Sequence, residues 1–197
     1  MNKLFITLLL GLFSLISYPS WGVDFDKGLA AYKRGDLATA LRELTPLAEQ
    51  GNAGAQYYLA QMYRRGDGVL QDYKTASKWY SLAAEQGDAA AQYNLALMYA
   101  DGDGVLQDYK TAVKWYRLAA EQGDAEAQTN LGLMYAMGNG VLLDDIYAHM
   151  WWNISASNGD KAAAVNRDIV AKKMTPSQLE KAQDLARKCV AKNYKGC

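Results

Sequence analysis

The sequence predicts an all-α fold, a right-handed α-solenoid of antiparallel helix pairs. A block of 36 residues, 55–90, recurs as residues 91–126 with 29 identical positions, and residues 127–162 match the second copy at 18 positions. Within each copy, apolar residues recur at the three- and four-residue spacing of a helix. A fixed period of this length is typical of stacked helix pairs, in which each unit buries its apolar face only against its neighbours. Such a stack presents an extended surface, which favours binding over catalysis.

The first segment, residues 1–22, is predicted to be a secretory signal peptide. Lys3 precedes a largely apolar run over residues 4–16, and Ser20 and Gly22 supply the small side chains expected before a cleavage site. As a helix this run would span roughly 20 Å, less than the roughly 30 Å hydrocarbon core of a bilayer. We therefore expect cleavage after Gly22, no stable membrane insertion afterwards, and a periplasmic or secreted protein. The alternative is that the segment forms a buried first helix.

The next segment, residues 23–54, is predicted to form a divergent first repeat. Tyr32 lies four residues before the aspartate that follows it, whereas Tyr63 lies nine residues before the matching aspartate, so this unit lacks five residues of the turn. Such divergence suits a capping repeat, because the outer face of an end unit meets water.

Each of the three repeats that follow is predicted to form two helices. The repeats cover residues 55–90, 91–126 and 127–162. In the second repeat, Asp88 is expected to cap a helix over about residues 89–100. Asp108 is expected to cap another over about residues 109–122, which Gly123 ends. A glycine pair between the two helices allows a turn with positive φ.

One tryptophan recurs at the same position of every repeat, as Trp79, Trp115 and Trp151. Aromatic residues at helical spacing more often fill a core than bind a ligand. We therefore expect these indoles to fill the space between repeats, beside alanines that let the helix backbones approach one another.

The last segment, residues 163–197, is predicted to be a C-terminal helical cap. One helix is expected over residues 162–172 and another over about residues 176–188. Thr175 stands three residues before Gln178, which is the spacing of a capping box, with proline at the first helical position. The final helix is expected to close the open end of the core.

The charges divide the chain after signal cleavage into an acidic array and a basic tail. Residues 23–160 hold 11 basic and 18 acidic side chains, whereas residues 161–197 hold 9 basic and 3 acidic ones. A basic tail suits an anchor for nucleic acid or anionic lipid, but export argues against nucleic acid. Blocks of five or more adjacent like charges are absent, so solvated helix faces are the preferred interpretation.

The repeated motifs resemble those of a known family. They are Ala-Gln-Tyr-x-Leu-Ala-x-Met-Tyr, Gly-Asp-Gly-Val-Leu-Gln-Asp-Tyr-Lys-Thr-Ala and Lys-Trp-Tyr-x-Leu-Ala-Ala-Glu-Gln-Gly-Asp-Ala. Residues 55–162 thereby resemble the Sel-one-like repeat family, a relative of the tetratricopeptide repeat. The resemblance implies an α-solenoid, a non-enzymatic scaffold in protein complexes, and an exported bacterial protein.

The same resemblance implies a binding groove. In tetratricopeptides the first helix of each repeat lines the concave face, and the residue before the conserved leucine binds an extended peptide. Asn94 and Asn130 occupy that position. The full set of candidates is Tyr57, Gln61, Arg64, Tyr93, Asn94 and Asn130. The alternative is that these are exposed helix residues free to drift.

Two cysteines, Cys189 and Cys197, lie eight residues apart. A continuous helix would separate their Cα atoms by about 12 Å, beyond the roughly 7 Å limit for a disulfide. Pairing therefore requires the chain to turn near Asn193 or Gly196, and the alternative is two free thiols. No metal site is expected, because two cysteines without a nearby histidine do not complete a tetrahedral shell.

The only histidine, His149, lies one helical turn after Asp145. A hydrolase triad would need a serine or cysteine nucleophile brought to it. We instead expect a surface or inter-helix imidazole that hydrogen-bonds to Asp145.

The sequence thus predicts an exported, non-enzymatic scaffold that binds a protein or peptide partner through its concave surface. No cofactor, no metal and no nucleic acid are expected. One alternative is a cell-envelope enzyme that binds or hydrolyses β-lactams, as cysteine-rich relatives with this repeat have been suggested to do. Another is a protein that assembles with itself through exposed repeat faces.

Overall fold

The computed structural model describes residues 24–197, so the predicted signal peptide lies outside the described residues. Within that range the chain forms ten α-helices and no strands. They are α1 (Phe25–Lys33), α2 (Leu37–Glu49), α3 (Ala53–Arg65), α4 (Tyr73–Glu85), α5 (Ala89–Asp101), α6 (Tyr109–Ala120), α7 (Ala125–Met137), α8 (Asp145–Ser157), α9 (Lys161–Ala171) and α10 (Pro176–Ala191). The all-α solenoid prediction is confirmed.

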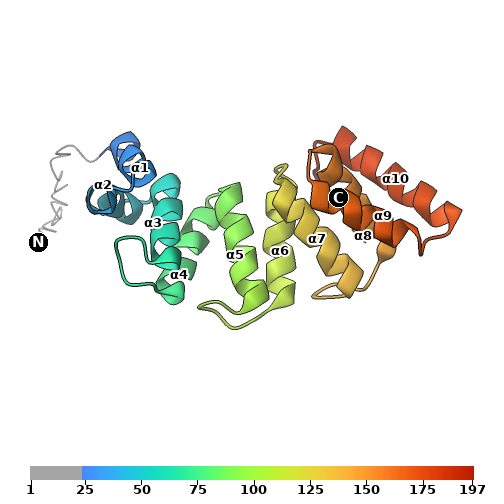
Figure 1. Cartoon of the computed structure of the whole chain (residues 1–197), viewed down its shortest axis with the longest axis horizontal. Coiled ribbons are helices and arrows are strands. Elements are labelled where there is room, and N and C mark those ends of the chain that lie inside the picture. Colours follow the sequence, from blue (N-terminus) through green and yellow to red (C-terminus); the bar gives the residue numbers. More distant parts are fainter. Residues whose placement is uncertain (1–23) are drawn as a thin grey trace, which may run out of the picture.

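The helices follow one another along a shallow arc, with α1 at one end and α9 and α10 at the other (Figure 1). Each helix from α1 to α8 packs against the next in the chain, and α10 packs back against α8. Long-range order therefore arises from contacts between neighbours, as in other repeat arrays. None of the helices in residues 24–197 is long and apolar enough to cross a membrane.

Aspartates cap eight of the ten helices in residues 24–197, and glycines end the first helix of each of the three repeats. The Asp88 carboxylate accepts a hydrogen bond from the Ala91 amide, and Gly102 follows α5 with φ of 81°. This is the cap geometry that the sequence predicts. The predicted end of the second helix was two residues too late, because the amides of Gln122 and Gly123 bond to carbonyls three residues back, those of Ala119 and Ala120, and the α-helical pattern of α6 ends there.

The core between repeats is built on tyrosines rather than on all three tryptophans. Tyr80 and Tyr116 are fully buried, and so is Trp151. Trp79 and Trp115 are only partly buried, but each packs against the buried clusters of two successive repeats, so these indoles lie between repeats as expected. Adjacent helical residues point about 100° apart, and in α4 and α6 the inward direction belongs to the tyrosine.

A ladder of buried amides connects successive repeats. Gln92 donates a 3.1 Å hydrogen bond to the Ala84 carbonyl and accepts one of 2.8 Å from Gln122. Equivalent bonds recur one repeat earlier and one repeat later: Gln56 with Ala48 and Gln86, and Gln128 with Ala120 and Asn158. Because buried polar groups are costly unless paired, this ladder fixes how each repeat sits on the next.

The second glycine of the turn allows repeats to stack closely. A Cβ added at Gly104 would overlap the Tyr73 carbonyl, and one at Gly140 would overlap the Tyr109 carbonyl. Both glycines also have positive φ, of 69° and 72°. The turn of each repeat thus lies directly on the backbone of the preceding repeat.

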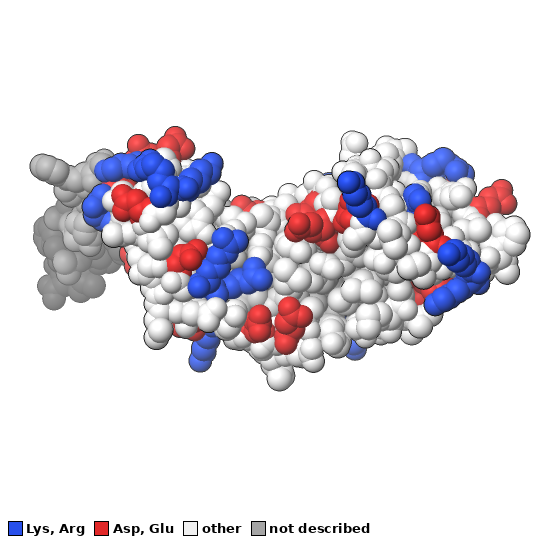
Figure 2. Space-filling view, viewed as in Figure 1, with Lys and Arg blue, Asp and Glu red and all other residues white. Residues whose placement is uncertain are grey.

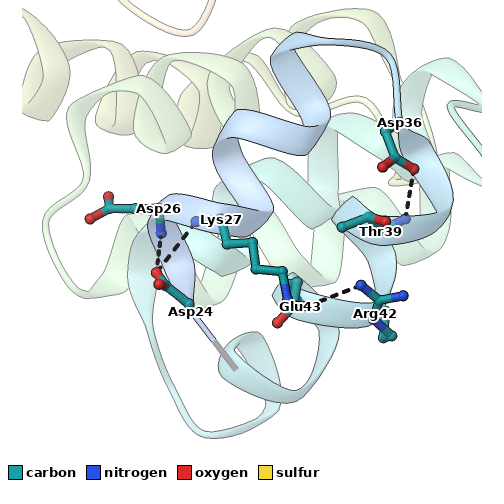
Figure 3. Close-up of polar contacts among 7 residues, drawn as sticks. All are labelled: Asp24, Asp26, Lys27, Asp36, Thr39, Arg42 and Glu43. Atoms are coloured by element: carbon teal, nitrogen blue, oxygen red, sulfur yellow. Dashed lines mark hydrogen bonds and ion pairs between the residues drawn. The ribbon is translucent and has the colours of Figure 1, made fainter. Parts of the chain in front are cut away.

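The N-terminal unit replaces the recurring tryptophan by Glu43, which is buried. Its carboxylate lies 2.7 Å from the Lys27 ammonium and 3.2 Å from the Arg42 guanidinium (Figure 3). The hydrogen bond from Lys27 holds the pKa of Glu43 below its usual value, against the opposing effect of burial. This charged cluster joins α1 to α2 where later repeats use an aromatic ring.

The C-terminal unit contains the two predicted helices, and the capping box of Thr175 with Gln178 is present. A disulfide joins Cys189 to Cys197, whose Cα atoms lie 5.5 Å apart. The chain turns between them through Asn193 and Tyr194, both with positive φ. Closure of the array is only partial, because the side chains of Val165 and Ile169 on α9 remain more than half exposed.

Candidate functional site

A cleft of about 360 Å³ opens where α3, α5 and the start of α7 come together. We call it the central groove. Its lining residues are Tyr57, Gln61, Arg64, Arg65, Ala90, Tyr93, Asn94, Leu97, Asp124 and Glu126. The structure thus brings together five of the six predicted candidates. Asn130 does not line the groove, although its side chain is near enough to Tyr93 to lower the pKa of that hydroxyl against the larger effect of burial.

Helical spacing places the groove residues of α3 on one face. The spacing between Tyr57, Gln61 and Arg64 is four and then three residues, so the three side chains are neighbours on one side of the helix. The Gln61 side-chain amide donates to the Tyr57 hydroxyl. The opposite face of α3 carries Leu59 and Met62, which are buried in the core. Core packing therefore fixes the direction in which the polar face points.

Asn94 supports a neighbouring guanidinium rather than facing the groove with a free amide. Its Oδ1 accepts a 2.8 Å hydrogen bond from Nη1 of Arg64, and its Nδ2 donates a 2.8 Å bond to the Ala90 carbonyl. The Asn94 side chain is largely buried. Arg64 has five N–H donors, and Asn94 occupies one of them. The group available to a ligand is therefore Arg64, held in place by Asn94.

Tyrosine rings form the floor of the central groove. Tyr57 packs on Tyr80 with ring centroids 5.9 Å apart, and Tyr93 packs on Tyr116 at 6.1 Å. Burial, with a further contribution from the Glu126 carboxylate, raises the pKa of Tyr93 to about 12. Burial also raises the pKa of Tyr57. At neutral pH these hydroxyls are therefore protonated, and the floor is aromatic and uncharged.

The two ends of the groove carry opposite charges. Arg64 and Arg65 belong to the last turn of α3, whereas Asp124 caps α7 and Glu126 lies in its first turn. None of these four residues takes part in an ion pair within residues 24–197. Figure 2 shows basic and acidic side chains interspersed over this view of the molecule, with uncharged surface between them.

The lining of the central groove coincides with the differences between the two most similar repeats. Those repeats differ at seven pairs of positions. Five of these pairs contribute a residue to the groove: Tyr58/Asn94, Gln61/Leu97, Arg64/Ala100, Arg65/Asp101 and Ala90/Glu126. Sequence reasoning overlooked Arg65, Leu97 and Glu126 as site residues, although this comparison of copies contained the signal for them.

His149, which sequence reasoning placed beside Asp145, lies on α8. Its side chain is buried, and its Nδ1 makes no hydrogen bond within the described residues. The predicted hydrogen bond to Asp145 was therefore wrong. Burial lowers the pKa of His149, the Arg167 guanidinium lowers it further, and the Asp168 carboxylate opposes both. Residues 24–197 also contain no group of three or more His, Cys, Asp or Glu side chains suited to a metal.

Comparison with known proteins matches three consecutive segments of the chain to the family model described as Sel1 repeat. The segments are residues 53–88, 89–124 and 125–160. Each begins two residues before the repeat defined from the sequence, because the match starts at the first residue of α3, α5 or α7. Together they cover more than half of the chain.

Two solved structures share the fold. A Sel1 repeat protein from Oxalobacter formigenes superposes with a TM-score of 0.70 at 30% identity, over 84% of this chain and 75% of that one. A protective antigen of uropathogenic Escherichia coli strains, described as displaying an SLR fold, superposes with a TM-score of 0.52 at 30% identity. The latter alignment covers 85% of this chain and 47% of the antigen.

A curated relative is similar over a shorter stretch. It is an exopolysaccharide production negative regulator from Rhizobium leguminosarum bv. viciae, 44% identical over 57 residues. The matched region is 29% of this chain and spans only 21% of the regulator.

Proposed function

This chain belongs to the Sel1 repeat family, whose repeats typically mediate protein interactions, and from that premise we propose that its central groove binds an extended segment of a partner protein. The observation that carries the proposal is the concentration of copy-to-copy differences in one cleft. The stacking contacts are the same in both repeats, as the amide ladder shows, whereas the groove residues are not. The need to stack thus accounts for the residues that the two repeats share, and binding of a ligand accounts for the positions at which they differ.

The chemistry of the groove suits a polypeptide backbone. Arg64 retains donors for the carbonyl oxygens of an extended segment, and Asn94 holds it in a fixed orientation. Tyr57 and Tyr93 are partly exposed, so their rings offer apolar area to side chains of the segment at low entropic cost. Arginine and tyrosine are also the residue types enriched at energetically important interface positions.

Site-specific photocrosslinking tests this proposal. A benzoylphenylalanine placed at Leu97 lies inside the groove, whereas one placed at Lys78 lies on an exposed part of α4. We expect the Leu97 probe to crosslink one segment of a partner protein in cell-envelope extract, and the Lys78 probe not to do so. Substituting Arg64→Ala and Asn94→Ala together should abolish the crosslink without changing helicity. Equal crosslinking from both probes would remove the groove assignment.

We further propose that the chain is exported and acts without catalysing a reaction. Export is supported by the signal-like pattern of residues 1–22 and by the disulfide between Cys189 and Cys197, since disulfides persist in oxidising compartments. N-terminal sequencing of the processed protein should begin at Val23, and an unprocessed N-terminus would refute export. The absence of catalysis is supported by membership in a repeat family whose members are generally non-enzymatic interaction scaffolds. Hydrolysis of a chromogenic β-lactam by the purified protein, lost in His149→Gln, would overturn it.

A further inference from the structure

We infer that the segment bound in the central groove is dipolar, with an acidic side chain facing Arg64 and Arg65 and a basic side chain facing Asp124 and Glu126. This inference rests on the proposed function and specifies the chemistry of the partner. It follows from the placement of opposite charges at the two ends of one cleft. The aromatic floor between them carries no charge at neutral pH.

The basic end is available for an anionic partner. Arg64 bonds to the neutral amide of Asn94, and Arg65 approaches only the Tyr32 hydroxyl, at 3.4 Å. Neither contact neutralises a guanidinium. Arg64 is also partly buried, where a charge interacts more strongly with an opposite charge than it does in bulk water. Asp67 is linked to Arg65 only through the Tyr32 hydroxyl, so a ligand carboxylate would supply the direct ion pair that neither arginine makes within residues 24–197.

The acidic end is available for a cationic partner. One carboxylate oxygen of Asp124 accepts the Ala127 amide as the cap of α7, which fixes the side chain in place. Glu126 is exposed and forms no ion pair within residues 24–197. The N-terminus of α7 offsets part of this charge, by about half an elementary charge. Two carboxylates therefore leave a net negative end.

This polarity is not a by-product of the repeating sequence. The positions equivalent to Arg64 and Arg65 are Ala100 and Asp101 in the second repeat, so the basic pair occurs once. In the third repeat they are Ala136 and Met137. The positions equivalent to Glu126 are Ala90 and Ala162. The arginine pair and Glu126 thus occur only where they face this cleft, whereas Asp124 recurs in the scaffold as the capping residues Asp88 and Asp160.

Selection of displayed peptides against the folded protein tests the inference. We expect random twelve-residue peptides that bind wild type to contain an acidic residue separated from a basic one. Replacing the acidic residue of a selected peptide by alanine should weaken binding to wild type about fivefold, which is typical of one exposed ion pair. The same replacement should leave binding to an Arg65→Glu variant nearly unchanged, because the introduced carboxylate offsets the remaining charge of Arg64. Replacing the basic residue should behave likewise with Glu126→Lys.

The outcomes separate this inference from the proposed function. Selected peptides without charge preference, unaffected by Arg65→Glu and Glu126→Lys but lost in an Arg64→Ala, Asn94→Ala variant, would overturn the dipolar partner and leave groove binding intact. If no selected peptide crosslinks to the probe at Leu97, groove binding fails and the dipolar partner fails with it. Lys74→Glu, an exposed change on α4, serves as the matched charge-reversal control and should alter neither result.

Discussion

Gln122 donates a 2.8 Å hydrogen bond to Gln92, which lies thirty residues earlier. Both residues belong to the repeat of residues 91–126, Gln92 near its start and Gln122 near its end. Gln92 in turn donates to the Ala84 carbonyl of the preceding repeat. One buried amide therefore links the second helix of one repeat to both helices of the next. Because the same pair recurs at each junction, the relative position of the repeats is set by hydrogen bonding as well as by apolar packing.

Replacing Gln92 by alanine should lower the free energy of unfolding by about 1 to 3 kcal/mol, since the change leaves buried partners unpaired. Urea unfolding followed by far-UV circular dichroism measures the loss. Gln50→Ala is the matched control, because Gln50 occupies the position of Gln86 and Gln122 but is exposed and makes no side-chain hydrogen bond within the described residues. Equal losses from Gln92→Ala and Gln50→Ala would contradict a structural role for the ladder.

Gly104→Ala should destabilise the chain more than Gly87→Ala, although both glycines have positive φ. A Cβ at Gly87 meets nothing within 4 Å, so only the backbone cost of about 1 to 2 kcal/mol applies. A Cβ at Gly104 would also overlap the Tyr73 backbone, which adds a further cost of about 1 to 3 kcal/mol. Midpoints of thermal unfolding compare the two variants. Indistinguishable midpoints would mean that the turn does not press on the preceding repeat.

Within α6, truncating the smaller aromatic should cost more than truncating the larger one. Tyr116 is 1% exposed, whereas Trp115 is partly exposed and lies beside the Lys114 ammonium. Tyr116→Ala should therefore lose about 3 to 5 kcal/mol, in the range for a buried aromatic, and Trp115→Ala should lose clearly less. Denaturant titrations of the two variants decide the order. A larger loss for Trp115→Ala would restore the tryptophan-centred core that the sequence suggested.

Stability should fall as the pH drops below about 6.5, the usual pKa of histidine. Burial lowers the pKa of His149 in the folded chain, so the unfolded chain takes up a proton at a higher pH than the folded chain does. The stability contributed by keeping the imidazole neutral is fully present above pH 6.5 and is lost on acidification through that value. His149 is the only histidine, so unfolding measured from pH 7.5 to 5 isolates its effect.

In His149→Gln the dependence over that window should disappear. A separate loss of stability is expected only below about pH 4, where the aspartates that cap the helices become protonated. Hydrogen bonds from the Thr75 and Thr111 side chains lower the pKa of Asp72 and Asp108, respectively. An unchanged dependence between pH 7.5 and 5 in His149→Gln would assign the titration to another group.

The sequence predicted the helices well because their signals are local. Aspartate caps, glycine stops and apolar spacing act within a few residues, and they placed α5 and α9 within one residue of their observed ends. Periodicity could not decide between Trp115 and Tyr116, since neighbouring residues on one helix both fall near the apolar face. Only the position of the adjoining helices determines which ring is enclosed.

The candidate site was harder to predict because its contacts join separate repeats. The role of Asn94 depends on Arg64, thirty residues earlier, and no local pattern connects the two. His149 was misjudged for a similar reason: spacing suggested a bond to Asp145, whereas tertiary packing buries the imidazole. The positions of Arg65 and Glu126 were nevertheless visible in the sequence, as places where near-identical copies diverge.

The uniform junction between repeats has a consequence for how this molecule can change in length. A duplicate of residues 91–126 inserted after residue 126 would find its amide partners on both sides, so the array could grow without a new interface. The same insertion would carry Asp124 and Glu126 into the added unit and repeat them further along the arc, while Arg64 stayed where it is. Growth by duplication therefore preserves the framework and multiplies only one end of the recognition surface.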